Sequence, residues 1–132
     1  MSTSKPSNSE LQVLGVLWDH GPSTVREVMK LLPDGKERAY TTVLTILQGL
    51  EKKKLVAHTA KGNAHVFHAT KDRERVVRPI LRQFLDHVFK GSASAALQHM
   101  VSERKLAREE IEEIRRLADE AEKRSRKKGV RK

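Results

Sequence analysis

The most constraining feature of this sequence is a helical segment that is followed at once by two short strands. Residues 39–53 carry apolar side chains at the spacing of one helix face. That face consists of Val43, Ile46, Leu47 and Leu50. Residues 55–59 and 64–69 are predicted to form two strands, and residues 60–63 between them contain the glycine of a hairpin turn. The segment therefore predicts one amphipathic helix joined to a β-hairpin.

Two shorter helices are predicted ahead of this segment. Residues 7–10 match a capping box, and apolar residues continue at helical spacing as far as Trp18. After the break at Gly21, either Ser23 or Thr24 can cap a second helix. Three helices followed by a hairpin are the order of a winged helix-turn-helix domain, in which the third helix enters the major groove of DNA.

The outward face of the third helix is unusual for a solvent-exposed surface. Three of its residues are threonines, which are mediocre helix formers, whereas solubility alone would favour Glu and Lys there. Short hydroxyl and amide side chains suit a surface that touches base edges and phosphates, although a merely tolerated polar face is the alternative interpretation. The predicted DNA-binding residues are Arg38, Tyr40, Thr41, Thr42, Thr45, Gln48, Lys61 and Asn63.

Apolar residues in the second half of the chain exceed what one small domain can cover. A helix is predicted to open at Lys71 or Asp72 and to end at Gly91, and Pro79 is expected to kink it or shift its start. A second helix over about residues 107–126 carries a narrow apolar stripe. This surplus favours a second copy of the chain as the partner, while folding back onto the chain's own domain is the alternative. The predicted dimerisation residues are Ile80, Leu81, Phe84, Leu85, Val88, Phe89, Ile111 and Ile114.

These patterns predict a mainly α-helical fold with a small β-hairpin, in which a winged helix-turn-helix DNA-binding domain is followed by a helical dimerisation arm. The expected divisions are a disordered N-terminus (1–8), the DNA-binding domain (9–72), the helical dimerisation domain (73–122) and a basic disordered tail (123–132).

The composition limits which partners the protein is expected to bind and where in the cell it is expected to lie. The chain of 132 residues has a net charge of +10, which favours an anionic partner. The absence of cysteine excludes disulfides, thiolate metal sites and cysteine nucleophiles. No apolar run approaches the roughly 18 residues of a membrane span, and the N-terminus lacks the apolar stretch of a signal peptide. We therefore expect a cytoplasmic protein that does not insert into membranes.

The sequence offers no catalytic or cofactor-binding constellation. The motifs GxxxxGK[ST], HExxH and GxSxG are all missing. His58, His65 and His68 lie on the predicted hairpin, and polar strand positions are favoured over a zinc site because His65 and His68 should point to opposite faces. We therefore expect a protein that is not an enzyme, with no catalytic residue, metal site or cofactor.

The third helix and the start of the hairpin carry a family resemblance. Residues 38–47 (Arg-Ala-Tyr-Thr-Thr-Val-Leu-Thr-Ile-Leu) and residues 50–56 closely resemble the recognition-helix signature of the penicillinase/methicillin repressor family (BlaI/MecI). Supporting matches occur in residues 11–18, 62–67, 89–92 and 109–114. The likeness covers about residues 9–120.

The resemblance implies a cytoplasmic bacterial repressor that binds a double-stranded DNA operator with inverted-repeat symmetry as a homodimer. In the β-lactam systems of this family, a membrane sensor protease signals cleavage within the dimerisation arm, which weakens the dimer and releases the DNA. A membrane sensor protease, or the protease that it activates, is therefore an implied partner.

Three positions depart from the family pattern. Where the best-known members are cut between Asn and Phe, this chain has His99 and Met100. The paired C-terminal cysteines of the copper-responsive (CopY-type) relatives are missing, and Asn63 replaces the frequent wing arginine. Proteolysis is expected between Gly91 and Val101, because the small residues there bury little surface. The candidate cleavage region includes Gly91, Ser92, His99 and Met100.

Two other classes of function stay open at this point. One is a basic architectural or RNA-associated protein whose Lys/Arg-rich tail dominates binding. The other is a protein–protein adaptor that reuses the winged helix. Removal of residues 123–132 should abolish architectural binding and spare sequence-specific binding, and an adaptor should lack affinity for DNA at low salt.

Overall fold

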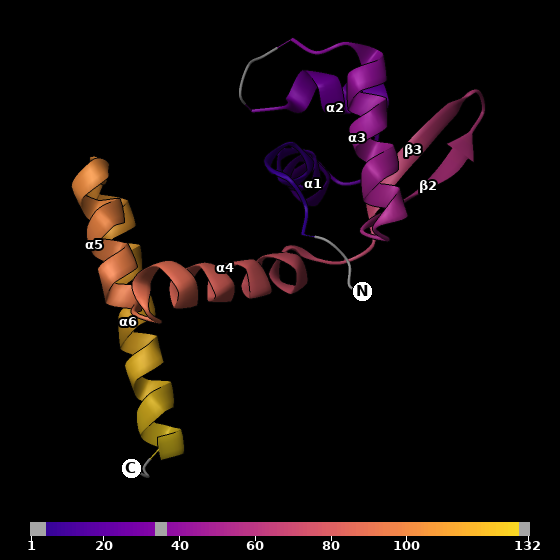
Figure 1. Cartoon of the computed structure of the whole chain (residues 1–132). Helices are drawn as coiled ribbons and strands as arrows, with labels where there is room; N and C mark the ends of the chain where they lie inside the picture. The colour runs from indigo at the N-terminus through magenta and orange to yellow at the C-terminus, as the bar shows by residue number, and fades with distance from the viewer. Residues whose placement is uncertain (1–4, 34–36, 130–132) are drawn as a thin grey trace. The chain divides into compact units, whose positions relative to one another are not determined.

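The computed structural model describes residues 5–33 and 37–129, and it divides into two units, Met1–Gln83 and Phe84–Lys132. The elements follow the order α1 (Asn8–His20), β1 (Ser23–Thr24), α2 (Val25–Leu31), α3 (Tyr40–Lys52), β2 (Val56–Lys61), β3 (Ala64–Ala69), α4 (Arg73–Phe89), α5 (Ala93–Glu103) and α6 (Arg108–Gly129) (Figure 1). The first unit holds the predicted winged helix-turn-helix and the first part of α4, and the second holds the end of α4 with α5 and α6.

Local capping signals place the first two helices where the sequence predicts them. At α1 the Ser7 hydroxyl accepts a hydrogen bond from Glu10 N, and the Glu10 carboxylate accepts one from Ser7 N. The same reciprocal pair joins Thr24 and Glu27 at α2, so Thr24 is the cap. Gly21 closes α1 with a φ of 85°, a backbone conformation that favours glycine.

A three-stranded antiparallel sheet with the order β1-β3-β2 covers one side of the helices. The predicted hairpin is confirmed, with His58 opposite Phe67 and a turn at Gly62, whose φ is +62°. Strand β1 is not predicted from the sequence. It pairs Thr24 with Val66 and has only two residues, too few to show any alternation of apolar and polar side chains.

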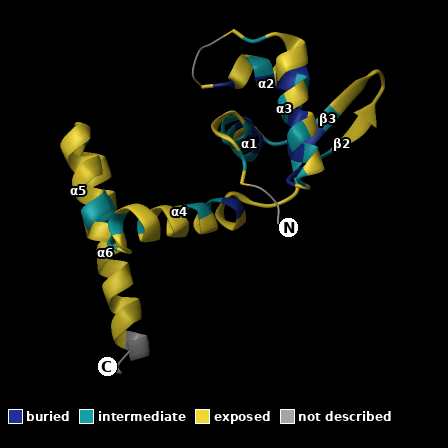
Figure 2. Cartoon of the chain, in the orientation of Figure 1, coloured by how far each residue is buried: buried dark blue, intermediate teal, exposed yellow. Residues whose placement is uncertain are grey.

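The core lies where α1, α2, α3 and the sheet meet (Figure 2). Its buried residues are Val13, Leu14, Val16, Leu17, Val25, Val28, Leu32, Val43, Leu47, Leu50, Leu55, Val56, Phe67 and Val76. The division between the two units falls after Gln83 instead of at the predicted boundary of 72/73. The reason is that α4 begins inside the first unit, where Val76 is buried and the Trp18 indole N–H donates to the Lys71 carbonyl at 2.9 Å.

The helices of the arm begin and end at identifiable caps. The Asp72 carboxylate accepts from Arg75 N, so α4 starts at Arg73 and Pro79 does not shift its start. Gly91, which has a φ of +83°, follows the last turn of α4 and donates its N–H to the Leu85 carbonyl of that helix. The Ser92 hydroxyl then accepts from Ala95 N at 3.0 Å and begins α5.

Both predicted disordered ends need correction. Ser7 caps α1 and Asn8 belongs to it, so the expectation of disorder is wrong for these residues, while residues 1–4 lie outside the described part. Helix α6 continues to Gly129, so the expectation of a disordered tail is wrong for residues 123–129. Residues with high helix propensity and an i,i+4 ion pair, Glu122 with Arg126 at 3.0 Å, favour this continuation. Residues 130–132 lie outside the described residues.

Glu10 connects the start of α1 to the end of α3. Its carboxylate lies 2.7 Å from Lys53 Nζ, which also donates to the Lys5 carbonyl at 3.1 Å. Partial burial works to raise the pKa of Glu10, but the hydrogen bonds from Lys53 and Ser7 outweigh it and hold the pKa below its usual value. Gly49 leaves room for this carboxylate, because a Cβ there would lie 3.0 Å from Glu10 Oε2.

We expect Glu10→Gln to lower the free energy of unfolding by about 1–2 kcal/mol at neutral pH, because the amide keeps the cap and loses the charge interaction. The folded-state pKa is depressed, so this contribution is present above the unfolded-state pKa and is lost as the pH falls through the folded-state pKa. Urea unfolding at about pH 7 and about pH 3 should show the difference shrinking in acid. Glu74→Gln, at an exposed pair, is the control. A difference of equal size at both pH values would contradict this assignment.

Candidate DNA-binding surface

The outward face of α3 presents a row of exposed polar side chains. Val43, Leu47 and Leu50 are fully buried on the inward face, which orients the helix and leaves the opposite face free. The exposed residues on that face include the predicted Thr41, Thr42, Thr45 and Gln48. Figure 1 shows α3 on the side of the first unit from which the β2–β3 hairpin projects.

Thr45 has a hydrogen-bonding role inside α3. Its hydroxyl donates to the Thr41 carbonyl one turn earlier, at 2.8 Å. The proton of this hydroxyl is therefore used within the helix, and the side chain offers an outside partner its oxygen lone pairs and its methyl group. Such a group suits an amino donor or a thymine methyl on a base edge.

Arg26 lies beside the start of α3, and the sequence reasoning missed it. Its guanidinium lies 5.2 Å from the centre of the Tyr40 ring, a cation–π distance. Tyr40 is the first residue of α3 and is 42% exposed. The exposed position of Arg26 in the second helix of a predicted helix-turn-helix is the one sequence signal for it. The predicted Arg38 precedes this turn of α3 and is half-buried.

The β2–β3 hairpin is connected to the last turn of α3 by a second contact that the sequence reasoning missed. His58 Nδ1 lies 2.8 Å from Glu51 Oε2, and the His58 ring stacks on His65 with 4.5 Å between ring centres. The hairpin register places His58 and His65 on one face, which is the signal that could have identified the pair. In the part of the chain that the structure describes, no three His, Cys, Asp or Glu side chains group as a metal site.

The hairpin turn presents the two predicted wing residues. Lys61 ends β2 and Asn63 lies in the turn before β3, and both side chains are exposed. Asn63 shares a surface pocket of about 400 Å³ with Tyr40, which brings two predicted DNA-binding residues together. The same pocket is lined by Thr24, Arg26 and His65, none of which is among the predicted DNA-binding residues.

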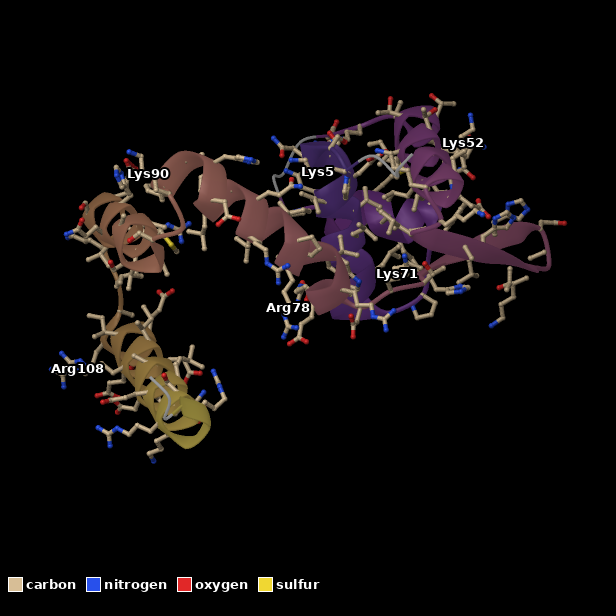
Figure 3. The ribbon with its side chains drawn as sticks, turned by 60° about the horizontal axis from the view of Figure 1, so that its bottom comes forward. Lys5, Lys52, Lys71, Arg78, Lys90 and Arg108 are labelled. Carbon is tan, nitrogen blue, oxygen red and sulfur yellow. The ribbon has the colours of Figure 1, made fainter. Side chains whose placement is uncertain are left out.

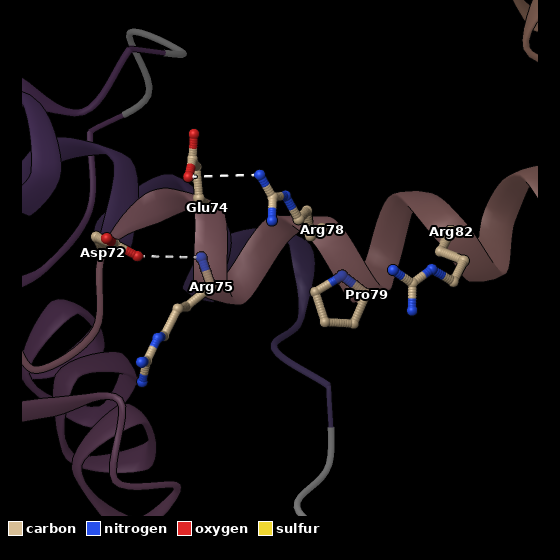
Figure 4. Close-up of a pocket in the computed structure, with 6 residues that line it drawn as sticks. All are labelled: Asp72, Glu74, Arg75, Arg78, Pro79 and Arg82. Atoms are coloured by element: carbon tan, nitrogen blue, oxygen red, sulfur yellow. Dashed lines mark hydrogen bonds and ion pairs between the residues drawn. The ribbon is translucent and has the colours of Figure 1, made fainter. Parts of the chain in front are cut away.

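Helix α4 carries a second basic surface. Arg75, Arg78 and Arg82 are exposed on one side of the helix, with Pro79 between them (Figure 4). Arg78 pairs loosely with Glu74 at 3.7 Å. Figure 3 shows that Arg78 and Lys52 of α3 project from different parts of the first unit, so this surface is separate from the outward face of α3.

The arm exposes large apolar side chains. On α4, Leu81, Phe84 and Val88 are each at least half exposed. Of the other predicted dimerisation residues, Leu85, Phe89 and Ile114 are half-buried and Ile111 is exposed. Ile80 differs, because it packs partly against the core of the first unit and some of its surface is covered within the chain. Among the described residues, no helix is both long enough and apolar enough to cross a bilayer.

Comparisons with known proteins agree on one family. A profile described as the penicillinase repressor matches residues 6–120. The transcriptional regulator BlaI of Mycobacterium tuberculosis is 35% identical over 115 residues, which cover 86% of this chain and 82% of that protein. The penicillinase repressor of Bacillus licheniformis is 26% identical over 114 residues, covering 86% and 89%.

Solved structures agree on the fold. MepR of Staphylococcus aureus, a transcription regulator of the multidrug efflux pump MepA, aligns with a TM-score of 0.52 and 23% identity, covering 87% of this chain and 76% of that one. At this identity the likeness shows the fold alone. The profile match and the identity to the mycobacterial protein show that this chain belongs to the penicillinase repressor family, a family of transcriptional repressors and not of enzymes.

Proposed function

We propose that this chain is a cytoplasmic repressor that binds an inverted-repeat DNA operator as a homodimer and blocks transcription. The observation that carries this proposal is the exposed, largely uncharged polar face of α3 beside a hairpin that bears Lys61 and Asn63. A helix with this surface can enter the major groove while the hairpin lies along the backbone. The names of the relatives support the same function.

In this proposal one group of residues contacts bases and another contacts phosphates. Thr41, Thr42, Thr45 and Gln48 approach base edges, which carry the sequence information. The phosphate contacts, which fix position without reading sequence, fall to Arg38, Tyr40, Lys61 and Asn63.

The exposed apolar residues of the arm supply the dimer interface in this proposal. Leu81, Phe84 and Val88 lie on one side of α4 at helical spacing. The aromatic cluster beside them supports the same surface, because the Phe89 ring contacts those of Phe84 and His99 at 5.7 and 5.3 Å between centres. A second copy of the chain would cover these side chains and bring two α3 helices to two half-sites.

Release of the operator follows from loss of the dimer. Most of the segment proposed for cleavage, between Gly91 and Val101, lies within α5, so a protease needs this helix to unfold locally. Helix α5 has no buried residue, which makes such opening inexpensive. The partner would be a membrane sensor protease or the protease that it activates.

Under β-lactam stress we expect a shortened chain, cut between Gly91 and Val101, to accumulate in the host as the regulated genes switch on. An immunoblot against the N-terminal domain measures this directly. Induction of the genes while only the full-length chain persists would exclude cleavage as the signal.

Lys61→Ala should weaken binding to every DNA sequence alike, because an exposed lysine at the hairpin turn contacts phosphate and not bases. The slope of log affinity against log salt should become about one unit shallower for each half-site. Anisotropy titrations on specific and random duplexes at several salt concentrations measure both quantities. A loss confined to the specific duplex would contradict the role of Lys61.

In vitro selection from random duplexes with the full-length chain tests the proposed function. We expect an inverted repeat whose half-sites are about one helical turn apart to be enriched. Retention of duplexes with no common sequence would instead favour the architectural alternative. Under that alternative, removal of residues 123–132 should abolish binding, whereas a repressor should keep its sequence preference.

A further inference from the structure

We propose that the pocket between Arg26, Tyr40, Asn63 and His65 holds one phosphate of the DNA backbone, with Arg26 as its cationic ligand. This inference rests on the proposed function, because it adds a backbone contact to the same DNA-binding surface. It assigns a role to Arg26 and His65, two residues outside the predicted recognition face.

The pocket forms where three separate elements meet. Pairing of β1 with β3 sets Thr24 opposite Val66, so the start of β3 lies beside the start of α2. Tyr40 contributes from the first turn of α3, and Asn63 contributes from the hairpin turn. The volume of about 400 Å³ falls within the range of pockets that hold small ligands.

The side chains around this pocket suit an anion. They supply a guanidinium, an amide, an imidazole and two hydroxyls, and no acidic residue is among those of the described chain that line the pocket. In the described part of the chain no carboxylate forms an ion pair with Arg26. The Tyr40 ring lies 5.2 Å from the guanidinium and restricts its position, which reduces the entropy lost when it binds a phosphate.

The opposite wall is also held in place. The His65 ring stacks on His58 at an interplanar angle of 20°, and Glu51 holds His58 at 2.8 Å. Glu51 comes from the last turn of α3, so the recognition helix supports this wall of the pocket from one end and lines it with Tyr40 at the other. A phosphate in the pocket would therefore contact the helix and the hairpin together.

The position of the pocket favours a backbone phosphate over a free one. Tyr40 immediately precedes the outward threonines of α3, and Asn63 immediately follows the glycine of the hairpin turn. A duplex that contacts both elements must pass the space between them. The strand between helix and hairpin would place a phosphate there without reading any base.

The first experiment replaces Arg26 by glutamine in the full-length chain and measures binding to the selected inverted repeat and to a random duplex. We expect about a tenfold loss of affinity on both and a salt slope about one unit shallower per half-site. Arg26→Lys should restore the slope because it keeps the charge. Arg82→Gln, on the separate surface of α4 (Figure 4), should leave both unchanged. Thermal melting confirms that each variant folds.

The second experiment replaces single backbone phosphates of the inverted repeat by neutral methylphosphonates. In each half-site we expect one phosphate whose replacement weakens binding of the native chain. The same replacement should have no effect on binding of the Arg26→Gln variant, and it should still weaken binding of the Lys61→Ala variant. Two results would overturn the inference: an unchanged salt slope for Arg26→Gln, or the lack of any phosphate whose replacement has an effect that depends on Arg26. The proposed function would still stand in either case if an operator had been selected.

A titration with inorganic phosphate in the absence of DNA tests the other source of the anion. If the NMR shifts of Asn63 and His65 saturate below about 1 mM phosphate, the pocket is assigned to a free anion instead. Failure to select any operator would count against the proposed function itself.

Discussion

Replacing Phe84 by alanine is expected to shift the dimer dissociation constant by about two to four decades. Phe84 is 50% exposed in the single chain, and its ring contacts Phe89, so a partner would bury it against an existing aromatic cluster. Truncation of a buried Phe typically costs about 3–5 kcal/mol, and each 1.4 kcal/mol is about a factor of ten. Sedimentation velocity over a concentration series measures the shift directly.

The matched control is Gln83→Ala, the neighbouring exposed residue of α4, which should leave the dimer constant unchanged. A stable monomer for the native chain at micromolar concentration would contradict the dimer proposal. Equal dimer constants for the native chain and Phe84→Ala would show that this face is not the interface.

The double variant Thr42→Ala, Thr45→Ala is expected to lose preference for the selected operator. Each lost base contact should cost about 1–3 kcal/mol and relax specificity at its own base pair. Affinity for random duplexes should stay nearly unchanged, because neither hydroxyl is proposed to contact phosphate. Competition between operator and random duplex gives the specificity ratio.

Unfolding cannot account for this loss, because alanine is a better helix former than threonine and both positions are exposed. Unchanged operator preference in the double variant would exclude these threonines from the recognition face.

The elements with local signals could be predicted from the sequence. The capping boxes at Ser7 and Thr24 and the glycine in the hairpin turn depend on neighbouring residues only, and the structure places them as expected. Strand β1 could not be predicted, since it exists only because β3 offers a partner. The disordered tail predicted from residue 123 overlaps the helix predicted to about residue 126, and α6 continues to Gly129, because basic side chains of high helix propensity extend a helix in spite of their charge.

Some features of the candidate DNA-binding surface could also be predicted from the sequence, and others could not. Exposure of the threonines and Gln48 followed from the 3.6-residue period of α3. The contacts of Arg26 with Tyr40 and of Glu51 with His58 join residues from different elements, so no single-segment pattern predicts them. The hydrogen bond from the Thr45 hydroxyl to the Thr41 carbonyl could be predicted from the sequence, because a threonine hydroxyl in a helix often donates to the carbonyl four residues earlier.

The central claim is that two copies of this chain read two half-sites together. The most direct measurement compares binding to the selected inverted repeat with binding to the same duplex after one half-site is scrambled. The proposal predicts two chains per intact duplex and an affinity that falls by about a hundredfold or more on the scrambled one, because the second contact forms at high effective concentration. Equal affinities for the two duplexes, or one chain bound per intact repeat, would contradict it.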